Sequence, residues 1–170
     1  RELRTMTVGV MGTGKIGFTI IKSLSGFGCR IIPNDVYEND AVRAYAEYVD
    51  LDTLYRESDI ITIHTPLLPE TTGMIDREAI AKMKDGVVFI DNARGELMDI
   101  DAVTEAVESG KFGALFMDAF PGETGIIHVP HDEDIIRTPG MPYFKLKYLR
   151  SFVNVYHTPH MAFFTEEAAE

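Results

Sequence analysis

The stretch VGVMGTGKIG, from Val8 to Gly17, fits two nucleotide-binding patterns at once. Counted from Gly9, it is G-x-x-x-x-G-K, most of the P-loop that binds the phosphates of ATP or GTP. Counted from Gly12, it is G-x-G-x-x-G, the turn that binds the diphosphate of a dinucleotide. A P-loop needs Ser or Thr after its lysine to bind Mg²⁺, but Ile16 holds that place. The dinucleotide pattern is therefore favoured.

Each residue of the dinucleotide pattern has a physical role. Gly12 permits the tight turn, Gly14 lets the diphosphate approach the backbone, and Gly17 lets the following helix pack closely on the strand. The N-terminus of that helix offers amide groups and the positive end of its dipole to an anion. We expect these amides to be those of Lys15 and Ile16.

The acid that completes this pattern is Asp35, which lies 18 residues beyond Gly17 and follows a second predicted strand. A carboxylate at this distance accepts hydrogen bonds from the adenine ribose hydroxyls and repels a 2′-phosphate. No Arg or Lys occurs from Val36 to Asp40 to offset that charge. The sequence therefore predicts NAD rather than NADP or ATP, although Asp35 could also be a turn residue within NDVYEND.

Short apolar runs alternate with helical patterns along the chain, as expected for a parallel sheet that is covered on both faces. Right-handed crossovers between such strands produce a Rossmann-type, doubly wound α/β fold. We predict six strands, at Met6–Met11, Cys29–Ile32, Ile60–His64, Val87–Asp91, Ala114–Asp118 and Val153–Thr158. We predict helices at Ile16–Gly26, Arg77–Lys84 and Asp101–Ser109.

Two details of these helices can be predicted. The first helix repeats Ile16, Ile20 and Leu24 at the spacing of one apolar face. The last helix has two candidate N-caps, Asp99 and Asp101, because an aspartate can accept hydrogen bonds from the unpaired amides of a first turn.

The segment Gly122–Arg150 is predicted to leave the sheet, since it has no clear periodicity before a short helical pattern at Tyr143–Leu149. His128 and His131, beside the acidic run Asp132–Asp134, could form a metal site. A solvated acidic loop is the better explanation of these residues, so we predict no metal.

The composition is that of a globular protein, with 45% hydrophobic and 10% aromatic residues among 170. No run approaches the ~18 apolar residues of a membrane span. The net charge of −11, from 16 basic and 27 acidic residues, argues against a nucleic-acid surface. A single cysteine, Cys29, excludes an internal disulfide and fits a reducing compartment; without a signal peptide, we expect a cytoplasmic protein.

Three residues that follow predicted strands indicate a reaction: Arg94, Glu123 and His160. An arginine can bind a carboxylate with two hydrogen bonds, and a histidine is the usual proton donor near neutral pH. An adjacent glutamate would orient the ring and favour its protonated form. This set suits the reduction of a 2-oxo acid, although each residue alone could be a surface arginine, a loop acid or a packed histidine.

The sequence resembles the NAD-binding domain of the D-isomer-specific 2-hydroxyacid dehydrogenases, and within them the D-lactate dehydrogenase branch. The resemblance covers nearly all of the chain except Thr124–Asn154. The matching segments are VGVMGTGKIG, ITIHTPLLPETTGMI, AKMKDGVVFIDNARGELMD, AVESGKFGALFMDAFPGE and YHTPHMAFFTEEA.

The resemblance implies roles for individual residues. Arg94 would bind the substrate carboxylate and carbonyl, His160 would be the acid/base, and Glu123 its partner. Asp91 is a departure, because relatives usually have Asn there, and it is expected to alter hydrogen bonding near the cofactor. The further cofactor-binding residues would be Thr65 and Pro66 on the adenine side, Thr71 near the phosphates, Asn92, Ala93 and Arg94 under the nicotinamide ribose, and Asp118 at the carboxamide.

The resemblance also implies that residues 1–170 are one domain of a longer protein. The substrate domain would be built from segments before Arg1 and after Glu170, so we expect the chain to bind NAD but to turn over slowly or not at all. Relatives imply a homodimer and a pyruvate-like substrate. The alternative is an NAD(H)-sensing binding module like the C-terminal-binding-protein corepressors, which share this fold and can retain the Arg–Glu–His set.

Overall fold

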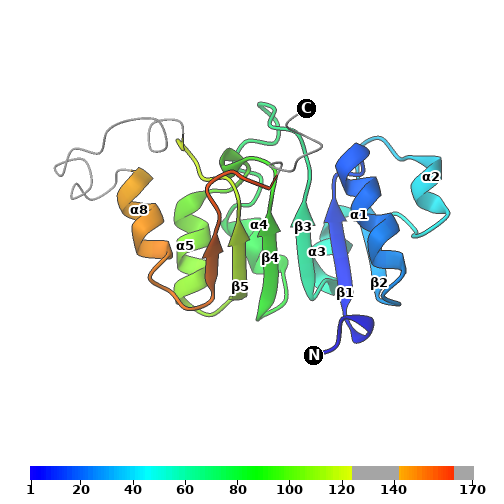
Figure 1. Cartoon of the computed structure of the whole chain (residues 1–170), viewed down its shortest axis with the longest axis horizontal. Helices are drawn as coiled ribbons and strands as arrows, with labels where there is room; N and C mark the ends of the chain where they lie inside the picture. The colour runs from blue at the N-terminus through cyan, green and yellow to red at the C-terminus, as the bar shows by residue number, and fades with distance from the viewer. Residues whose placement is uncertain (124–141, 163–170) are drawn as a thin grey trace.

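The centre of the molecule is a six-stranded sheet in which every neighbouring pair of strands is parallel. The strand order is β2-β1-β3-β4-β5-β6 (Figure 1). The computed structural model describes residues 1–123 and 142–162. Its strands are β1 (Thr7–Met11), β2 (Arg30–Asn34), β3 (Ile60–Ile63), β4 (Val87–Asp91), β5 (Phe112–Met117) and β6 (Val155–His157).

Helices connect these strands, so the α/β doubly wound fold predicted from the sequence is confirmed. The α-helices of the described ranges are α1 (Lys15–Ser25), α2 (Asp40–Arg43), α3 (Leu51–Glu57), α4 (Arg77–Lys82), α5 (Ile100–Glu108) and α8 (Pro142–Leu149). Two short 3₁₀ helices are η1 (Leu3–Thr5) and η2 (Gly95–Leu97).

Two hydrophobic clusters lie on opposite faces of the sheet. One joins Val8, Val10 and Ile31 to Ile21 of α1 and Val42 of α2. The other cluster joins strand residues that point to the opposite face, such as Ile61 and Phe89, to α3, α4, α5 and α8. Because side chains of a strand point alternately to its two faces, helices on both faces require strands that are apolar throughout.

The order of the strands fixes where a ligand can bind. The chain passes from β1 through α1 to β2 on one side, and then crosses to β3 on the other side of β1. This reversal is the topological switch point of a doubly wound sheet, and ligands bind in the crevice outside the carboxyl ends of the strands there. All six strands have their carboxyl ends at the upper edge of the sheet in Figure 1.

The predicted apolar face of α1 is confirmed at Leu24, which packs against the core, but is wrong at Ile16. Ile16 is 65% exposed, whereas Gly17 and Ile21 are the buried residues of this helix. The reason lies in the turn before the helix. Gly17 must face the sheet because only a residue without a side chain fits there, and the buried stripe therefore continues at Ile21, four residues later.

Helices α2 and α3 were not predicted, and several strand ends differ from the prediction. The strand β2 continues through Pro33 and Asn34, where a proline followed by polar residues suggested that the strand had already ended. Pro33 is tolerated because β2 is an edge strand of the described sheet, so that its missing N–H removes no inter-strand bond on the open side.

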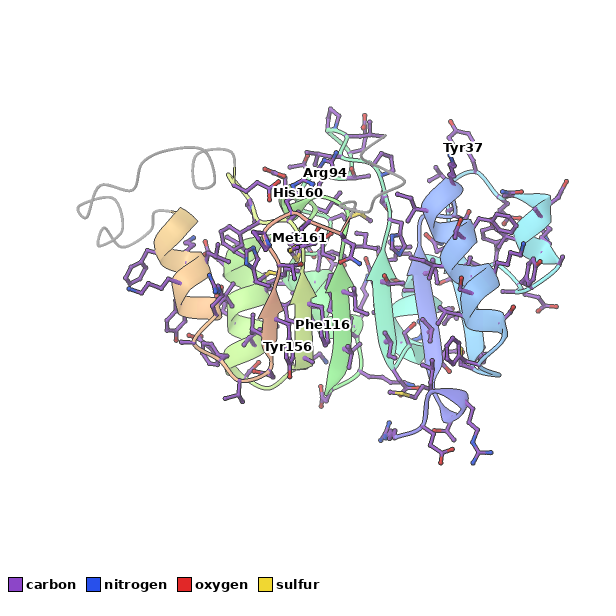
Figure 2. The ribbon with its side chains drawn as sticks, in the orientation of Figure 1. Tyr37, Arg94, Phe116, Tyr156, His160 and Met161 are labelled. Atoms are coloured by element: carbon purple, nitrogen blue, oxygen red, sulfur yellow. The ribbon has the colours of Figure 1, made fainter. Side chains whose placement is uncertain are left out.

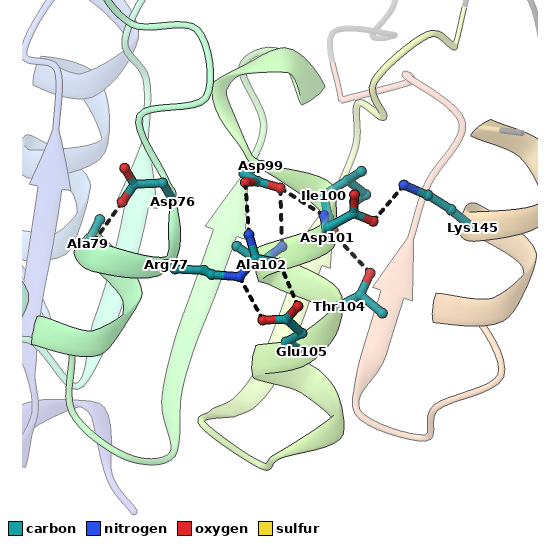
Figure 3. A network of polar contacts seen from close by, with 10 residues as sticks. All are labelled: Asp76, Arg77, Ala79, Asp99, Ile100, Asp101, Ala102, Thr104, Glu105 and Lys145. Carbon is teal, nitrogen blue, oxygen red and sulfur yellow. Dashed lines mark hydrogen bonds and ion pairs between the residues drawn. The ribbon is translucent and has the colours of Figure 1, made fainter. Parts of the chain in front are cut away.

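Of the two candidate caps of α5, the structure selects Asp99. Its carboxylate accepts hydrogen bonds from the amides of Asp101 and Ala102. Asp101 lies in the first turn and pairs with Lys145 of α8, and Arg77 of α4 pairs with α5 through Glu105 (Figure 3). These polar contacts hold three neighbouring helices of one layer together at their exposed edges.

The predicted helix at Tyr143–Leu149 corresponds to α8, which begins at Pro142. The candidate metal ligands from His128 to Asp134 lie outside the described residues. In the part of the chain that the structure describes, no group of three or more His, Cys, Asp or Glu side chains could hold a metal ion. No helix within the same ranges is long and apolar enough to cross a membrane.

Candidate functional site

The predicted site residues follow different strands of the sheet, and the parallel arrangement brings them to one edge. They are Gly12, Gly14, Lys15, Ile16 and Gly17 after β1, Asp35 after β2, Thr65, Pro66 and Thr71 after β3, Asn92, Ala93 and Arg94 after β4, Asp118 and Glu123 after β5, and His160 after β6. All of these residues therefore follow the carboxyl ends of the strands, which lie along one edge of the sheet.

The glycine turn after β1 is shaped by close backbone contacts. Gly12 has a φ of +87°, and a Cβ on it would lie 2.8 Å from the carbonyl carbon of His64. A Cβ on Gly17 would lie 2.0 Å from the carbonyl oxygen of Gly12. By contrast, a Cβ on Gly14 would meet no atom within 4 Å. The fold therefore requires glycine at 12 and 17, whereas Gly14 faces open space.

The helix that begins at this turn presents amide groups to that space. The first hydrogen bond to the turn runs from the Phe18 N–H to the Gly14 carbonyl, at 2.9 Å. The amides of Lys15, Ile16 and Gly17 precede it and have no acceptor within the helix. Gly14 caps the helix without any side-chain hydrogen bond. This geometry suits a phosphate group, because both the amides and the helix dipole attract an anion.

Asp35 lies against the glycine turn. Its Oδ2 accepts hydrogen bonds from the Thr13 N–H at 2.6 Å and from the Thr13 hydroxyl at 3.1 Å, and its Oδ1 accepts from the Tyr37 N–H at 3.0 Å. The carboxylate at the end of β2 is therefore fixed beside the space in front of Gly14. A turn role and a ligand role are compatible here, since two oxygens can accept more than three hydrogen bonds.

Sequence reasoning missed Thr13. It is 2% exposed, and its hydroxyl lies 2.7 Å from the Tyr48 hydroxyl as well as bonding Asp35. Thr13 thus links the turn to the end of β2 and to the segment before α3. Its position between two glycines of the motif was the only available signal, because the partners Asp35 and Tyr48 come from distant parts of the chain.

The segment after β3 forms an internally bonded loop. The Thr71 hydroxyl donates to the carbonyl of Pro66 at 2.7 Å and accepts from the Leu68 N–H at 2.8 Å. Thr65 is half-buried, and Pro66 is exposed. Thr71 therefore holds the loop that carries Thr65 and Pro66, and the structure places all three beyond the carboxyl end of β3.

His64, the first residue after β3, is a half-buried histidine that the sequence analysis did not single out. Burial lowers the pKa of its imidazole to about 4. Its Nε2 lies 2.9 Å from the Thr62 hydroxyl, and its amide donates to the Met11 carbonyl. His64 is thus a neutral packing residue at the switch point, directly behind Gly12.

The segments after β4 and β5 pack against each other. A Cβ on Gly95 would lie 2.3 Å from the carbonyl carbon of Phe120, so glycine is needed for this approach. The Gly122 N–H also donates to Glu96 Oε1 at 3.2 Å. As a result, the exposed Arg94, whose Nη1 donates to the Ala93 carbonyl, stands next to the segment that carries the predicted acid.

Glu123 and His160 are in contact. Glu123 Oε1 lies within hydrogen-bonding distance of His160 Nδ1, and Glu123 Oε2 accepts from the Phe120 N–H at 3.1 Å. His160 has a φ of +49°, an unusual conformation for a residue with a side chain, and its N–H donates to the Asp118 carbonyl at 2.7 Å. Figure 2 shows His160 and Arg94 at the same end of the sheet.

Asp118 fixes the turn that contains His160. Its carboxylate accepts hydrogen bonds from the Thr158 hydroxyl and from the amides of Met161 and Ala162, the last two at 2.9 Å. Burial raises the pKa of Asp118, but these hydrogen bonds outweigh burial and hold it below its usual value. Thr158 was not predicted; it lies in the HTPH segment, where its bond to Asp118 is a tertiary contact that the motif does not reveal.

A shallow concavity of about 220 Å³ adjoins this edge. It opens between the ends of β4, β5 and β6, on the face of the sheet that α1 covers elsewhere. Its lining is mostly apolar, with one predicted site residue, Asn92, and with Thr158 beside the His160 turn; the full lining is Ile90, Asn92, Phe116, Met117, Tyr156 and Thr158.

Known proteins are similar to this chain in sequence and in fold. Residues 1–162 match the family described as D-isomer specific 2-hydroxyacid dehydrogenase, NAD binding domain. An aromatic 2-oxoacid reductase of Clostridium sporogenes is 44% identical over 168 residues, which cover 98% of this chain and 49% of that protein. A D-lactate dehydrogenase of Leuconostoc mesenteroides subsp. cremoris is 44% identical over 169 residues, covering 99% of this chain and 50% of that protein.

A solved structure agrees with these sequence relatives. The crystal structure of D-lactate dehydrogenase with NAD⁺ from Lactobacillus jensenii superimposes with a TM-score of 0.90 and 35% identity, and the match covers 99% of this chain and 49% of that one. The chain therefore spans about half the length of the relatives it matches.

Proposed function

The chain belongs to the NAD-binding domain family of the D-isomer specific 2-hydroxyacid dehydrogenases, and we propose that it serves the reversible reduction of a 2-oxo acid to the D-2-hydroxy acid. NAD is the cofactor of this family. The observation that carries the proposal is the contact between Glu123 and His160 at the same sheet edge as the glycine turn and Arg94. The alternative of a corepressor-type NAD(H)-sensing module is not supported by these relatives.

The glycine turn and Asp35 fit two parts of a dinucleotide that differ in charge, the anionic diphosphate and the neutral adenine ribose. The open space before Gly14 and the amides of Lys15 and Ile16 suit the diphosphate. Asp35, fixed beside that turn by Thr13, suits the adenine ribose hydroxyls and disfavours a 2′-phosphate. We infer that Thr65 and Pro66 line the adenine side and that Thr71 keeps their loop in place.

Two residues of the chain then act on the substrate. NADH supplies the hydride that the carbonyl carbon receives. Arg94 binds the substrate carboxylate and polarises the carbonyl, since a guanidinium matches a carboxylate with two parallel hydrogen bonds. His160 gives a proton to the carbonyl oxygen in reduction and removes it in oxidation.

Glu123 acts through His160. With Nδ1 turned to the Glu123 carboxylate, the Nε2 atom is the one that exchanges the proton with the substrate. The Glu123 carboxylate thereby fixes the orientation of the imidazole ring. Asn92 and Ala93 lie along the nicotinamide ribose in this proposal, and Asp118 combines the fixing of the His160 turn with acceptance of a hydrogen bond from the carboxamide.

The whole reaction needs more than this chain supplies. Since the chain spans about half the length of its relatives, we infer that residues 1–170 form the cofactor domain of a longer protein whose other segments complete the substrate pocket. On this proposal the chain alone binds NADH and reduces 2-oxo acids slowly or not at all. We further propose a homodimer, which the family resemblance implies, and a cytoplasmic location, which the single cysteine favours.

A panel of 2-oxo acids with NADH tests the reaction, using a protein that joins this chain to the remaining half of its relatives' length. We expect oxidation of NADH by pyruvate or by an aromatic 2-oxo acid, and a loss of about 10²–10⁴-fold in kcat for His160→Ala. His157→Ala, which removes a histidine outside the Glu123 pair, should retain most activity. Equal activity of the His160 variant would contradict the assignment.

A further inference from the structure

Asp91 is the last residue of β4 and has no exposed surface. Its Oδ1 accepts a hydrogen bond from the Ala93 N–H at 2.8 Å. Its Oδ2 is buried and has no hydrogen-bond partner among residues 1–123 and 142–162. The proposed reaction does not use this carboxyl.

A buried carboxylate oxygen without a partner is costly, because it has lost its water and gained nothing in exchange. The neutral acid removes that cost. Burial is the main cause that raises the pKa of Asp91 to about 7; the charges of Glu96 and Glu123 act in the same direction, and the Ala93 and Arg94 amides oppose it. The carboxyl therefore changes its charge near neutral pH.

Asp91 is bonded to both halves of the reaction site. Through Oδ1 it holds the turn that leads to Arg94. Through its carbonyl it accepts the Asp118 N–H at 2.9 Å, and the Asp118 carbonyl in turn accepts the His160 N–H at 2.7 Å. Asp91 is therefore tied through its side chain to the segment that leads to Arg94, and through its backbone to the segment that leads to His160.

We propose that Asp91 is a positioning residue that holds the Asn92–Arg94 segment as a neutral carboxylic acid, and that its ionisation weakens NADH binding. The inference rests on the proposed function, in which that segment lies along the nicotinamide ribose. A bound cofactor covers the segment and withdraws it further from water, which disfavours the charged form of Asp91.

The groups that face Asp91 strengthen this effect. Glu96 of η2 and Glu123 after β5 both bring negative charge, and the neighbouring Asp118 is itself an acid. Arg94 and His160, at the same edge, are assigned to the substrate and to Glu123. An ionised Asp91 would add a negative charge beside this acidic set.

The charge state can be measured without any activity. The ¹³C NMR signal of the Asp91 carboxyl, assigned by its loss in Asp91→Asn, is followed from pH 5 to pH 9 in the chain with and without NADH. We expect the signal to titrate near pH 7 in the free chain and at higher pH with NADH. A carboxyl that is already ionised at pH 5 would overturn the inference.

The functional consequence is measured by NADH fluorescence over the same range. The affinity of the chain should fall roughly threefold from pH 6 to pH 9, which corresponds to a difference of about half a pKa unit between the free and bound states. The NADH affinity of Asp91→Asn should not show this fall between pH 6 and pH 9. Asp85→Asn, the same substitution at a carboxyl with 92% of its side chain exposed, should behave as the parent chain does.

Two outcomes separate the inference from the proposed function. An Asp91→Asn chain with the parent's pH dependence would overturn the inference and leave the proposed function standing. Absence of NADH binding at every pH would overturn the proposed function, whereas the ¹³C titration would still decide whether Asp91 is a neutral acid.

Discussion

Two residues at the carboxyl ends of the strands, the half-buried His64 and the buried Asp91, should shift the stability with pH in opposite directions. The pKa of His64 is lowered to about 4, and that of Asp91 is raised to about 7. The contribution of His64 to the free energy of unfolding is therefore fully present above pH 6.5, the pKa of an unfolded histidine. It is lost as the pH falls toward 4, because the unfolded chain then binds a proton that the folded chain does not. For Asp91 the free energy of unfolding falls as the pH rises from 3.8, the pKa of an unfolded aspartate, to about 7, its pKa in the folded chain.

The substitution His64→Asn separates the two effects. In the parent chain they oppose each other, so the free energy of unfolding should change little between pH 7 and pH 4.5. Without His64, the contribution of Asp91 remains, and the variant should gain about 2 kcal/mol relative to the parent on acidification. Urea unfolding at both pH values measures this difference. An equal change in the free energy of unfolding for both chains would show that the pKa of His64 is not lowered in the folded chain.

At the residue scale, the sequence predicted the glycine turn and the positions of Arg94, Glu123 and His160, because a motif or a strand end marks each of them. It did not predict Thr13 or Thr158. Each of these owes its place to a partner far away in the chain, Asp35 and Asp118 respectively. A contact of this kind is created by the sheet and has no local pattern.

At the scale of elements, long apolar runs were easier to predict than short helices. Strands such as β4 carry their signal in five consecutive residues, and their predicted bounds agree with the structure. The seven-residue helix α3 was missed, although the six-residue α4 was predicted. The cap of α3 was a signal in the sequence: the Asp50 carboxylate accepts the Thr53 N–H at 2.8 Å.

The N-cap of α5 allows a direct test of an element boundary. Asp99→Ala removes two hydrogen bonds to first-turn amides and should lower the free energy of unfolding by about 1 kcal/mol. Asp101→Ala is the matched control, since it removes only an exposed ion pair with Lys145 and should cost less than about 0.5 kcal/mol. Chemical denaturation compares the two, and equal losses would mean that Asp99 does not cap the helix.

At the scale of the molecule, the alternation of strands and helices predicted the doubly wound sheet, but not how unevenly its faces are covered. On the face that carries α1, Phe116 is 37% exposed and Tyr156 is 53% exposed, with their rings stacked 4.6 Å apart (Figure 2). A run of apolar residues predicts a strand with two apolar faces. It does not reveal which part of the chain covers each face.

The whole arrangement has one purpose in our account: parallel strand ends form a single edge along which one extended ligand can lie. The glycine turn lies after β1 and the Glu123–His160 pair after β5 and β6, on opposite sides of the switch point. In this proposal a dinucleotide lies along that edge, with its diphosphate in the open space in front of Gly14.

Gly14→Ala tests this most directly, because the new methyl group enters space that no atom of the chain fills. The control is Gly26→Ala at the other end of α1, where the nearest atom lies 3.7 Å away. We predict that both variants fold with nearly unchanged Tm, and that Gly14→Ala alone loses NADH affinity by roughly tenfold or more, about 1.4 kcal/mol. Unaltered NADH binding by a folded Gly14→Ala chain would show that the diphosphate does not bind at this turn.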